Sequence, residues 1–268
     1  AAKMIGLKRL GIVTDLPGFM LRGGGKHTLY HRFADKVNNS YLAYFTHYVF
    51  LTEQMNQIVN KHHKPYIVME GLADEAMKTK ERRKIKKQKP KILLYAGGLH
   101  ERYGLKTLTE AFTQLDTQEW ILEIYGSGPF SRNLEKYAEK DKRIIYKGVV
   151  PNEKVVEAEL KASLLVNPRP TNEEFVKYSF PSKNMEYMVS GTPLLTTKLP
   201  GMPAEYYDHV YLFEKETTED YKNTLEKVFH LSSEELANKG QKARMFILSQ
   251  KNNVVQVKRI IDFMNTNK

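Results

Sequence analysis

The stretch Lys91-Ile-Leu-Leu-Tyr-Ala-Gly-Gly-Leu-His-Glu-Arg-Tyr-Gly104 decides the fold prediction for this chain of 268 residues. Its first six residues form an almost continuous apolar run, which is typical of a strand buried on both faces of a parallel sheet. Three glycines punctuate the loop that follows, and residues 105–115 then place apolar side chains at helical spacing. The stretch therefore predicts one strand–loop–helix unit of an α/β fold.

The same unit recurs along the chain on the carboxyl side of this stretch. Apolar runs predict further strands at residues 120–125, 144–146, 164–167, 194–196 and 211–213, and glycine or proline lies just beyond the first three of them. Helical segments separate most of these runs, so the pattern predicts a doubly wound parallel sheet. Ligands of such sheets bind outside the carboxyl ends of the strands, and we expect the functional residues in the loops that follow them.

A shorter version of the pattern precedes this unit. Residues 10–14, 48–51 and 66–69 are predicted strands, with helices expected at residues 29–38 and 53–60. Three helices are expected near the carboxyl terminus, at residues 219–229, 233–248 and 254–264, with Ser232 or Ser233 as the cap of the second. These patterns predict two α/β units of unequal size.

The positive charge of the chain is concentrated in one block. The formal net charge is +11, and residues 76–90 supply +7 of it through eight lysines and arginines against one glutamate. Such a block is typical of a solvated linker, and it would also be attracted to an anionic membrane surface. Nucleic-acid binding is the weakest interpretation, because no aromatic residue is interleaved with the basic ones.

Several classes of protein are excluded or disfavoured by what the sequence lacks. The absence of cysteine excludes a disulfide scaffold, a zinc–thiolate site, an iron–sulfur cluster and a cysteine nucleophile. The longest nearly apolar stretch, residues 41–51, is too short for a membrane-spanning helix, which needs about 20 residues. His27 and His31 share a helical face but lack a third ligand, so we expect no metal site. P-loop and serine-hydrolase motifs are also missing.

Two glycine-rich loops follow the first two strands of the larger unit. The backbone N–H groups of Gly97 and Gly98 are candidates for phosphate binding, and Arg102 would add a bidentate contact. Gly126 and Gly128 match the first two glycines of a dinucleotide-binding motif, but serine occupies the third position. We interpret this second loop as a turn at which the backbone approaches a ligand, and an NAD-dependent enzyme as the less favoured alternative.

The segment from residue 167 to residue 193 is the richest in polar groups. Pro181-Ser182 is typical of a helix start, with Ser182 as the cap. Ser182 and Lys183 would then lie at a positive helix end, which suits a diphosphate. Glu186 lies about one turn further on, where its carboxylate would suit the vicinal hydroxyls of a ribose.

Four motifs in order support a family resemblance over residues 91–212. They are Tyr95-Ala-Gly-Gly-Leu99 with Gly104, then Ile124-Tyr-Gly-Ser-Gly-Pro129, then Lys147-Gly148, and then Phe180-Pro-Ser-Lys-x-x-Glu-Tyr-Met-x-x-Gly-x-Pro193. This order resembles the donor-binding half of retaining family 4 glycosyltransferases of the GT-B fold, in the subgroup associated with bacterial surface polysaccharides.

The resemblance implies a domain organisation. Residues 1–75 would be a partial, Rossmann-like acceptor-side domain and residues 76–90 a basic linker. Residues 91–250 would be the doubly wound, Rossmann-like donor domain, and residues 251–268 a helix that crosses back to the first domain. Since the glycine-rich loop that the family carries further upstream is not in the sequence, we expect a chain that lacks the first part of its acceptor-side domain.

The resemblance also implies site residues. Glu186 matches the second of two family glutamates, which holds the ribose, while Tyr178 occupies the position of the first, so Glu173 or Glu174 is expected to replace that sugar-contacting carboxylate. Gly98 and Tyr103 occupy the positions of the family's phosphate-binding arginine and lysine. The expected catalytic residues are Lys183, Arg102 and Glu174, and the expected donor-binding residues are Gly97, Gly98, Gly126, Gly128, Ser182, Lys183 and Glu186, with Lys106 as a further nearby cation.

The function implied is transfer of a sugar from a nucleotide diphosphosugar, expected to be UDP-linked, to a saccharide or a lipid-linked acceptor with retention. Neither a metal nor another cofactor is expected, and no nucleic-acid partner. We expect a cytoplasmic protein that associates peripherally with the inner face of the cell membrane through the block from Lys78 to Lys89. Two alternatives stay open: a nucleotide-binding module without turnover, and an NAD-dependent enzyme.

Overall fold

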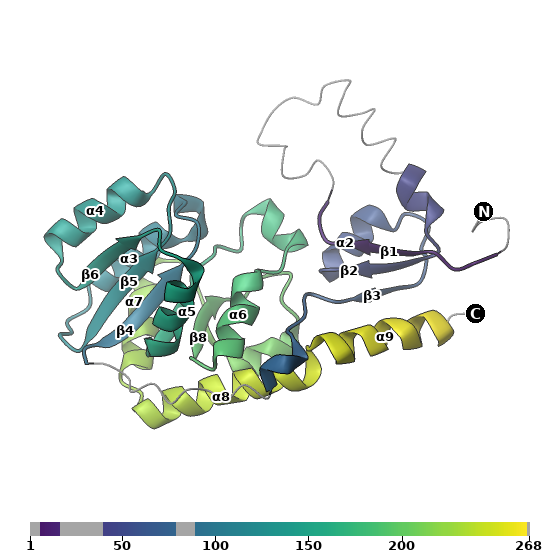
Figure 1. Cartoon of the computed structure of the whole chain (residues 1–268). Helices are drawn as coiled ribbons and strands as arrows, with labels where there is room; N and C mark the ends of the chain where they lie inside the picture. Colours follow the sequence, from purple (N-terminus) through teal and green to yellow (C-terminus); the bar gives the residue numbers. More distant parts are fainter. Residues whose placement is uncertain (1–5, 17–39, 79–88, 267–268) are drawn as a thin grey trace, which may run out of the picture.

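The protein is an α/β structure with two parallel sheets, which confirms the predicted fold class (Figure 1). The computed structural model describes residues 6–16, 40–78 and 89–266. The expected helix at residues 29–38, His27 and His31, and the basic block apart from its ends at Lys78 and Lys89 lie outside the described residues.

The larger sheet has six strands in the order β6-β5-β4-β7-β8-β9, all parallel. The strands are β4 (Lys91–Ala96), β5 (Trp120–Tyr125), β6 (Ile144–Gly148), β7 (Leu164–Asn167), β8 (Leu194–Thr197) and β9 (Tyr211–Phe213). Each apolar run predicted for this region forms a strand within two residues of the expected bounds. The central strand β4 is buried on both faces, which accounts for its unbroken apolar sequence.

Helices cover both faces of this sheet. They are α3 (Leu105–Thr113), α4 (Ser131–Lys140), α5 (Asn152–Lys161), α6 (Ser182–Ser190), α7 (Thr218–Phe229) and α8 (Ser233–Gln250). Leu93 and Tyr95 of β4 face a core that includes apolar residues of α3, α4 and α7, whereas Leu94 and Ala96 face a core that includes residues of α6 and α8. Ser232 caps α8 through a capping box with Glu235, as predicted.

The smaller sheet joins β1 (Leu10–Val13), β2 (His47–Phe50) and β3 (Tyr66–Val68) in that order. The helix α2 (Glu53–Val59) packs on it through Met55 and Val59, which share a core with Tyr48 and Phe50. Short 3₁₀ helices connect other elements: η1 (Glu75–Lys78), η2 (Glu101–Tyr103), η3 (Glu174–Tyr178) and η4 (Ala204–His209).

The last helix, α9 (Asn253–Thr266), runs beneath the smaller sheet (Figure 1). Its Gln256 donates a hydrogen bond to the Gly71 carbonyl at 3.0 Å, and its Phe263 ring lies 5.3 Å from the His47 ring. Within the described ranges, no helix combines the length and the apolar character needed to cross a membrane.

A cluster of charged residues connects the two sheets where α8 ends. The Lys251 ammonium lies 2.6 Å from the Glu70 carboxylate and 2.5 Å from that of Glu205, and the Tyr206 hydroxyl donates to Glu70 at 2.5 Å. Lys251 and Glu70 are both buried. We call these four residues the hinge cluster, because they join the end of β3 to η4 and α8.

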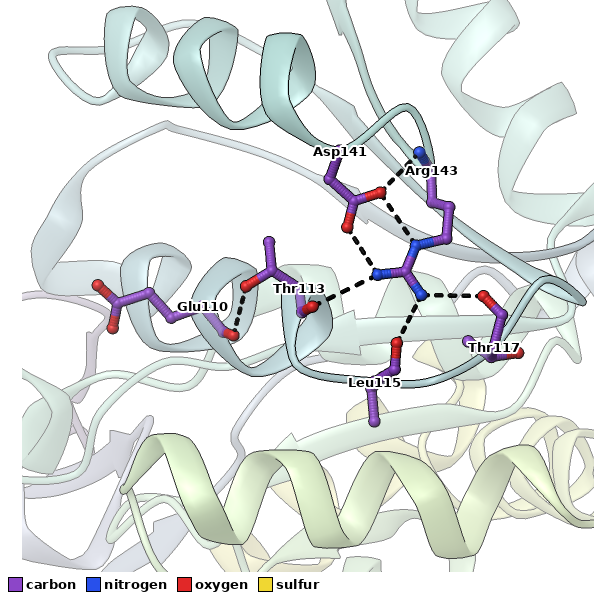
Figure 2. A network of polar contacts seen from close by, with 6 residues as sticks. All are labelled: Glu110, Thr113, Leu115, Thr117, Asp141 and Arg143. Atoms are coloured by element: carbon purple, nitrogen blue, oxygen red, sulfur yellow. Dashed lines mark hydrogen bonds and ion pairs between the residues drawn. The ribbon is translucent and has the colours of Figure 1, made fainter.

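A second polar network stabilises the corner where α3 ends and β6 begins (Figure 2). The Arg143 guanidinium donates two hydrogen bonds to the Asp141 carboxylate, at 2.9 and 2.7 Å. It also donates to the carbonyls of Leu115 at 2.6 Å and Thr117 at 2.9 Å, just beyond the last turn of α3. These bonds satisfy backbone carbonyls of the loop that follows α3.

Candidate functional site

The candidate site lies at the carboxyl edge of the larger sheet, where β4 and β7 meet. From β4 the chain builds the sheet outward through β5 and β6, and from β7 it builds through β8 and β9 on the other side. The loops after β4 and β7 therefore diverge at a topological switch point, which is where open α/β sheets bind ligands. The two loops touch at Gly104. A Cβ there would lie 1.9 Å from the Pro168 carbonyl oxygen, so the close approach requires glycine at this position.

The loop after β4 leaves the backbone amide of Gly98 open. The Gly97 N–H donates to the Tyr125 carbonyl at 3.1 Å, and the Leu99 N–H donates to the Ser127 carbonyl at 2.9 Å. The carbonyl of the exposed Gly98 accepts a hydrogen bond from the Tyr95 hydroxyl at 2.9 Å, while its N–H has no partner among the described residues. Of the two predicted amide donors, only that of Gly98 is available to a ligand.

The glycines of the second loop pack against the first loop. A Cβ on Gly126 would lie 1.9 Å from the Gly97 carbonyl oxygen, and one on Gly128 would lie 2.3 Å from that of Leu99. These approaches explain why both positions are glycine without any ligand. The predicted role of Gly126 and Gly128 in donor binding stays a prediction. The backbone approach that we expected toward a ligand is made toward the loop after β4.

Ser182 is the first residue of α6, and its predicted role as the helix cap is wrong. Pro181 occupies the capping position, and no side-chain bond caps the helix. The Asn184 N–H, which a cap would satisfy, donates instead to the Pro181 carbonyl at 2.9 Å. The Tyr187 hydroxyl ties α6 to the end of β4, since it accepts from the Ala96 N–H at 2.9 Å and donates to the Ala96 carbonyl at 3.2 Å.

Lys183 lies between two carboxylates. Its ammonium is 2.8 Å from Glu186 and 3.6 Å from Glu159 of α5. Glu159 is 1% exposed, and its Oε1 makes no hydrogen bond among the described residues. Burial and then the nearby Glu186 raise the pKa of Glu159 to about 7, against the opposing effect of Lys183. Sequence reasoning missed Glu159, because a single glutamate in an amphipathic helix gives no sign of burial.

Ser182 and Glu186 line a common cavity of about 530 Å³ between the two sheets. Its other walls are mostly apolar and include Leu51 from the smaller unit, Leu72 from the connection and Met185 from α6. Glu70 of the hinge cluster also lines it. The structure thus brings the predicted Ser182 and Glu186 together at the junction of the two units.

Tyr178 and Glu174 lie in η3, in the loop after β7. The Tyr178 side chain packs against the core of the smaller unit, and its hydroxyl donates to Glu174 at 3.1 Å. Glu174 is exposed and lies 2.9 Å from the Lys177 ammonium, whose hydrogen bond lowers the pKa of the Glu174 carboxyl. Glu173 precedes η3 and is half-exposed.

Arg102 and Arg169 lie on the same pair of aromatic rings. The Arg102 guanidinium is 5.5 Å from the ring centres of both Tyr103 and Phe175. The Arg169 guanidinium, from the loop after β7, is 4.9 and 5.5 Å from the same two centres. Arg102 was predicted as a site residue, whereas Arg169 was missed, since the sequence separates the two by 67 positions.

The candidate site offers few groups for a metal ion. In the part of the chain that the structure describes, no group of three or more histidine, aspartate or glutamate side chains is arranged to hold one.

Comparison with protein families identifies the class of the protein. Residues 77–246 match the family described as "Glycosyl transferases group 1", and the chain belongs to this family. A search of curated protein sequences found no match.

Solved structures with similar folds include a glycosyltransferase, a galactosyltransferase and a sucrose-phosphate synthase. The chain is 12% identical to Anabaena HepE, solved with UDP and glucose, with a TM-score of 0.65 over 100% of this chain and 73% of that one. It is 14% identical to sucrose-phosphate synthase from Thermosynechococcus elongatus, with a TM-score of 0.70 over 98% of this chain and 69% of that one.

A third similar structure is a Staphylococcus aureus TarM mutant, solved with Fondaparinux, alpha-GlcNAc-glycerol and UDP. The identity is 14% and the TM-score 0.68, over 98% of this chain and 53% of that one, so the chain spans about half the length of TarM. These likenesses confirm the GT-B fold.

Proposed function

We propose that this chain transfers a sugar from a UDP-sugar to a saccharide or lipid-linked acceptor, with retention at the anomeric carbon and without a metal ion. We further propose that it belongs to the family 4 glycosyltransferases that build bacterial surface polysaccharides. The observation that carries the proposal is the switch point between β4 and β7, which lies within the residues matched by the family. The similar HepE and TarM structures hold UDP, which supports a uridine nucleotide.

The proposed chemistry requires stabilisation of the leaving diphosphate. When the bond between the anomeric carbon and the diphosphate oxygen breaks, negative charge develops on UDP. Cations and backbone N–H groups that are already in place around the phosphates would lower this barrier, and one such contact contributes on the order of 3 kcal/mol. Arg102, Lys183 and the Gly98 amide are the groups that we propose for this role, and Glu186 would hold the ribose.

Turnover tests the proposal directly. The chain is mixed with UDP-sugars and with oligosaccharide or lipid-linked acceptors in the presence of EDTA, and release of UDP is followed together with the anomeric configuration of the product. We expect transfer with retention, and weaker UDP binding in Glu186→Ala and Lys183→Ala.

The matched control is Glu226→Ala, since Glu226 of α7 is also a partly exposed helical glutamate paired with a nearby lysine. Saturable UDP binding without transfer to any acceptor would favour the alternative of a nucleotide-binding module. Unchanged UDP affinity in both the Glu186 and the Lys183 variants would remove the assignment of these residues.

The anionic inner face of the cell membrane remains a proposed partner of the block from Lys78 to Lys89. The expected signature is binding to vesicles that contain anionic lipid, weakened by salt.

A further inference from the structure

Arg102 and Arg169 form a pair of cations held by a shared aromatic support, which we call the arginine pair. Tyr103 and Phe175 lie with ring centres 6.4 Å apart and ring planes at 65°, and each ring contacts both guanidinium groups. Cation–π contacts of this kind fix a guanidinium in position without neutralising its charge. The pair therefore concentrates positive charge at one place on the carboxyl edge of the sheet.

The charge of the arginine pair is not compensated by the described part of the chain. Neither guanidinium has an ion-pair or hydrogen-bond partner there, whereas Lys106 lies 3.5 Å from Glu101 and Lys183 contacts two carboxylates. Arg169 is half-buried, and burial lowers the pKa of its guanidinium, with Arg102 acting in the same direction. Two neighbouring cations, of which Arg169 is partly removed from water, form a site that an anion would stabilise.

The arginine pair also lies beside the open amide of the loop after β4. The Tyr103 ring that supports both arginines is the nearest neighbour of Gly98, with a ring carbon 3.4 Å from where a Cβ on Gly98 would stand. The Gly98 N–H has no partner among the described residues. Two forked donors and one backbone donor thus lie around the same Tyr103 ring, and donors of these kinds suit a phosphate group.

We propose that the arginine pair, together with the Gly98 amide, binds the diphosphate of the nucleotide sugar, and that Arg169 is a donor-binding residue. This inference rests on the proposed function and adds Arg169 to the groups proposed there for the diphosphate. Lys183 is paired with Glu159 and Glu186, so the arginine pair supplies more of the uncompensated positive charge than Lys183 does. Positions 98 and 103, where the family resemblance expects cations, are uncharged, and Arg169 supplies a cation to the same place from the loop after β7.

The test compares UDP with uridine in calorimetric titrations of the whole chain. The variants are Arg169→Ala, Arg169→Lys and Arg102→Ala, and the control is Lys227→Ala, which removes one exposed cation from the end of α7. We expect Arg169→Ala to weaken UDP binding about 10- to 100-fold and to leave uridine binding unchanged. Arg169→Lys keeps the charge but loses the forked pair of N–H donors, so its UDP affinity should lie between those of the wild-type chain and Arg169→Ala.

Each outcome bears on the proposal. Arg102 is exposed, so Arg102→Ala should fold normally and still lose UDP affinity, and retained uridine binding shows that the Arg169 variants keep a folded site. Equal UDP affinity in the wild-type chain, Arg169→Ala and Arg102→Ala would overturn the inference and leave the proposed function standing. If the wild-type chain bound neither UDP nor a UDP-sugar, the inference and the proposed function would both fail.

Discussion

Arg143 and Arg169 are two half-buried arginines on the same sheet with opposite surroundings. Arg143 lies just before β6, at the amino edge, and its guanidinium donates to the Asp141 carboxylate and to backbone carbonyls near the end of α3 (Figure 2). Arg169 lies just after β7, at the carboxyl edge, and its guanidinium contacts aromatic faces without a carboxylate partner in the described ranges. The Arg143 guanidinium is satisfied by hydrogen bonds inside the fold, whereas the Arg169 guanidinium stays available to a ligand.

This difference separates stability from binding in physical terms. A charged group whose hydrogen bonds are made inside the protein contributes to the free energy of unfolding, and its removal leaves its partners unsatisfied. A charged group without such partners is partly desolvated in the fold, which is unfavourable. A bound ligand of opposite charge compensates this desolvation free energy. We therefore expect substitutions of the internally paired cations to change stability, and substitutions of the arginine pair to change ligand affinity.

The largest expected effect on stability belongs to the hinge cluster. Lys251→Met should lower the free energy of unfolding by about 4 kcal/mol, because the buried Glu70 carboxylate would lose its ammonium partner. Urea denaturation measures this change. The control is Lys242→Met in α8, the helix that ends just before Lys251, where the lysine is exposed and the expected change is below about 0.5 kcal/mol. Equal effects for the two variants would show that the cluster does not hold the two units together.

Arg143→Met should lower the free energy of unfolding by about 3 kcal/mol, since Asp141 and the carbonyls beyond α3 would lose their charged donor. Arg143 lies at the opposite edge of the sheet from the candidate site, so UDP affinity should stay unchanged. Urea denaturation and calorimetric titration on the same sample would check both statements. A loss of UDP affinity in the folded variant would contradict the claim that Arg143 contributes to stability alone while Arg169 contributes to binding.

Much of the fold could be predicted from the sequence because each strand of the larger sheet is a separate apolar run. The run at residues 91–96 has no polar residue after Lys91, since β4 is covered by helices on both faces. Turn residues also marked where most strands end, as Gly97 and Gly126 illustrate. Local patterns were sufficient at these positions, because an unbroken apolar run is stable only when it is buried and a turn depends on the residues that form it.

The candidate site could be predicted only in part, because its groups meet through tertiary contacts. Gly98 and Arg102 follow the same strand and were found together, whereas Arg169 reaches the Tyr103 ring from another loop. Glu159 was missed for the same reason, since only the packing of α5 against α6 buries it beneath Lys183. The Ser182 cap was predicted wrongly, because a helix that starts at Ser182 takes Pro181 as its capping residue.

The smallest expected effect concerns Glu159, a buried carboxyl whose Oε1 makes no hydrogen bond within the described residues. Its pKa is about 7 in the folded protein, against an ordinary value of 4.5 that we take for the unfolded chain. Between these values the folded protein holds a proton that the unfolded chain has released, so the free energy of unfolding falls as the pH rises. The expected loss from this group is about 2 kcal/mol between pH 5 and pH 7.

Glu159→Gln should remove this part of the pH dependence, because the amide does not titrate. Relative to the wild-type chain, the variant should gain stability as the pH rises from 5 to 7, and urea denaturation at several pH values would measure the gain. Glu226→Gln is the matched control, since Glu226 is also a helical glutamate paired with a lysine but has a side chain that is 42% exposed and lies in α7, away from Glu159. If both variants kept the wild-type slope, Lys183 would hold the Glu159 carboxylate fully charged at pH 5. Lys183 would then be a paired cation of the same kind as Arg143, with its charge used inside the fold.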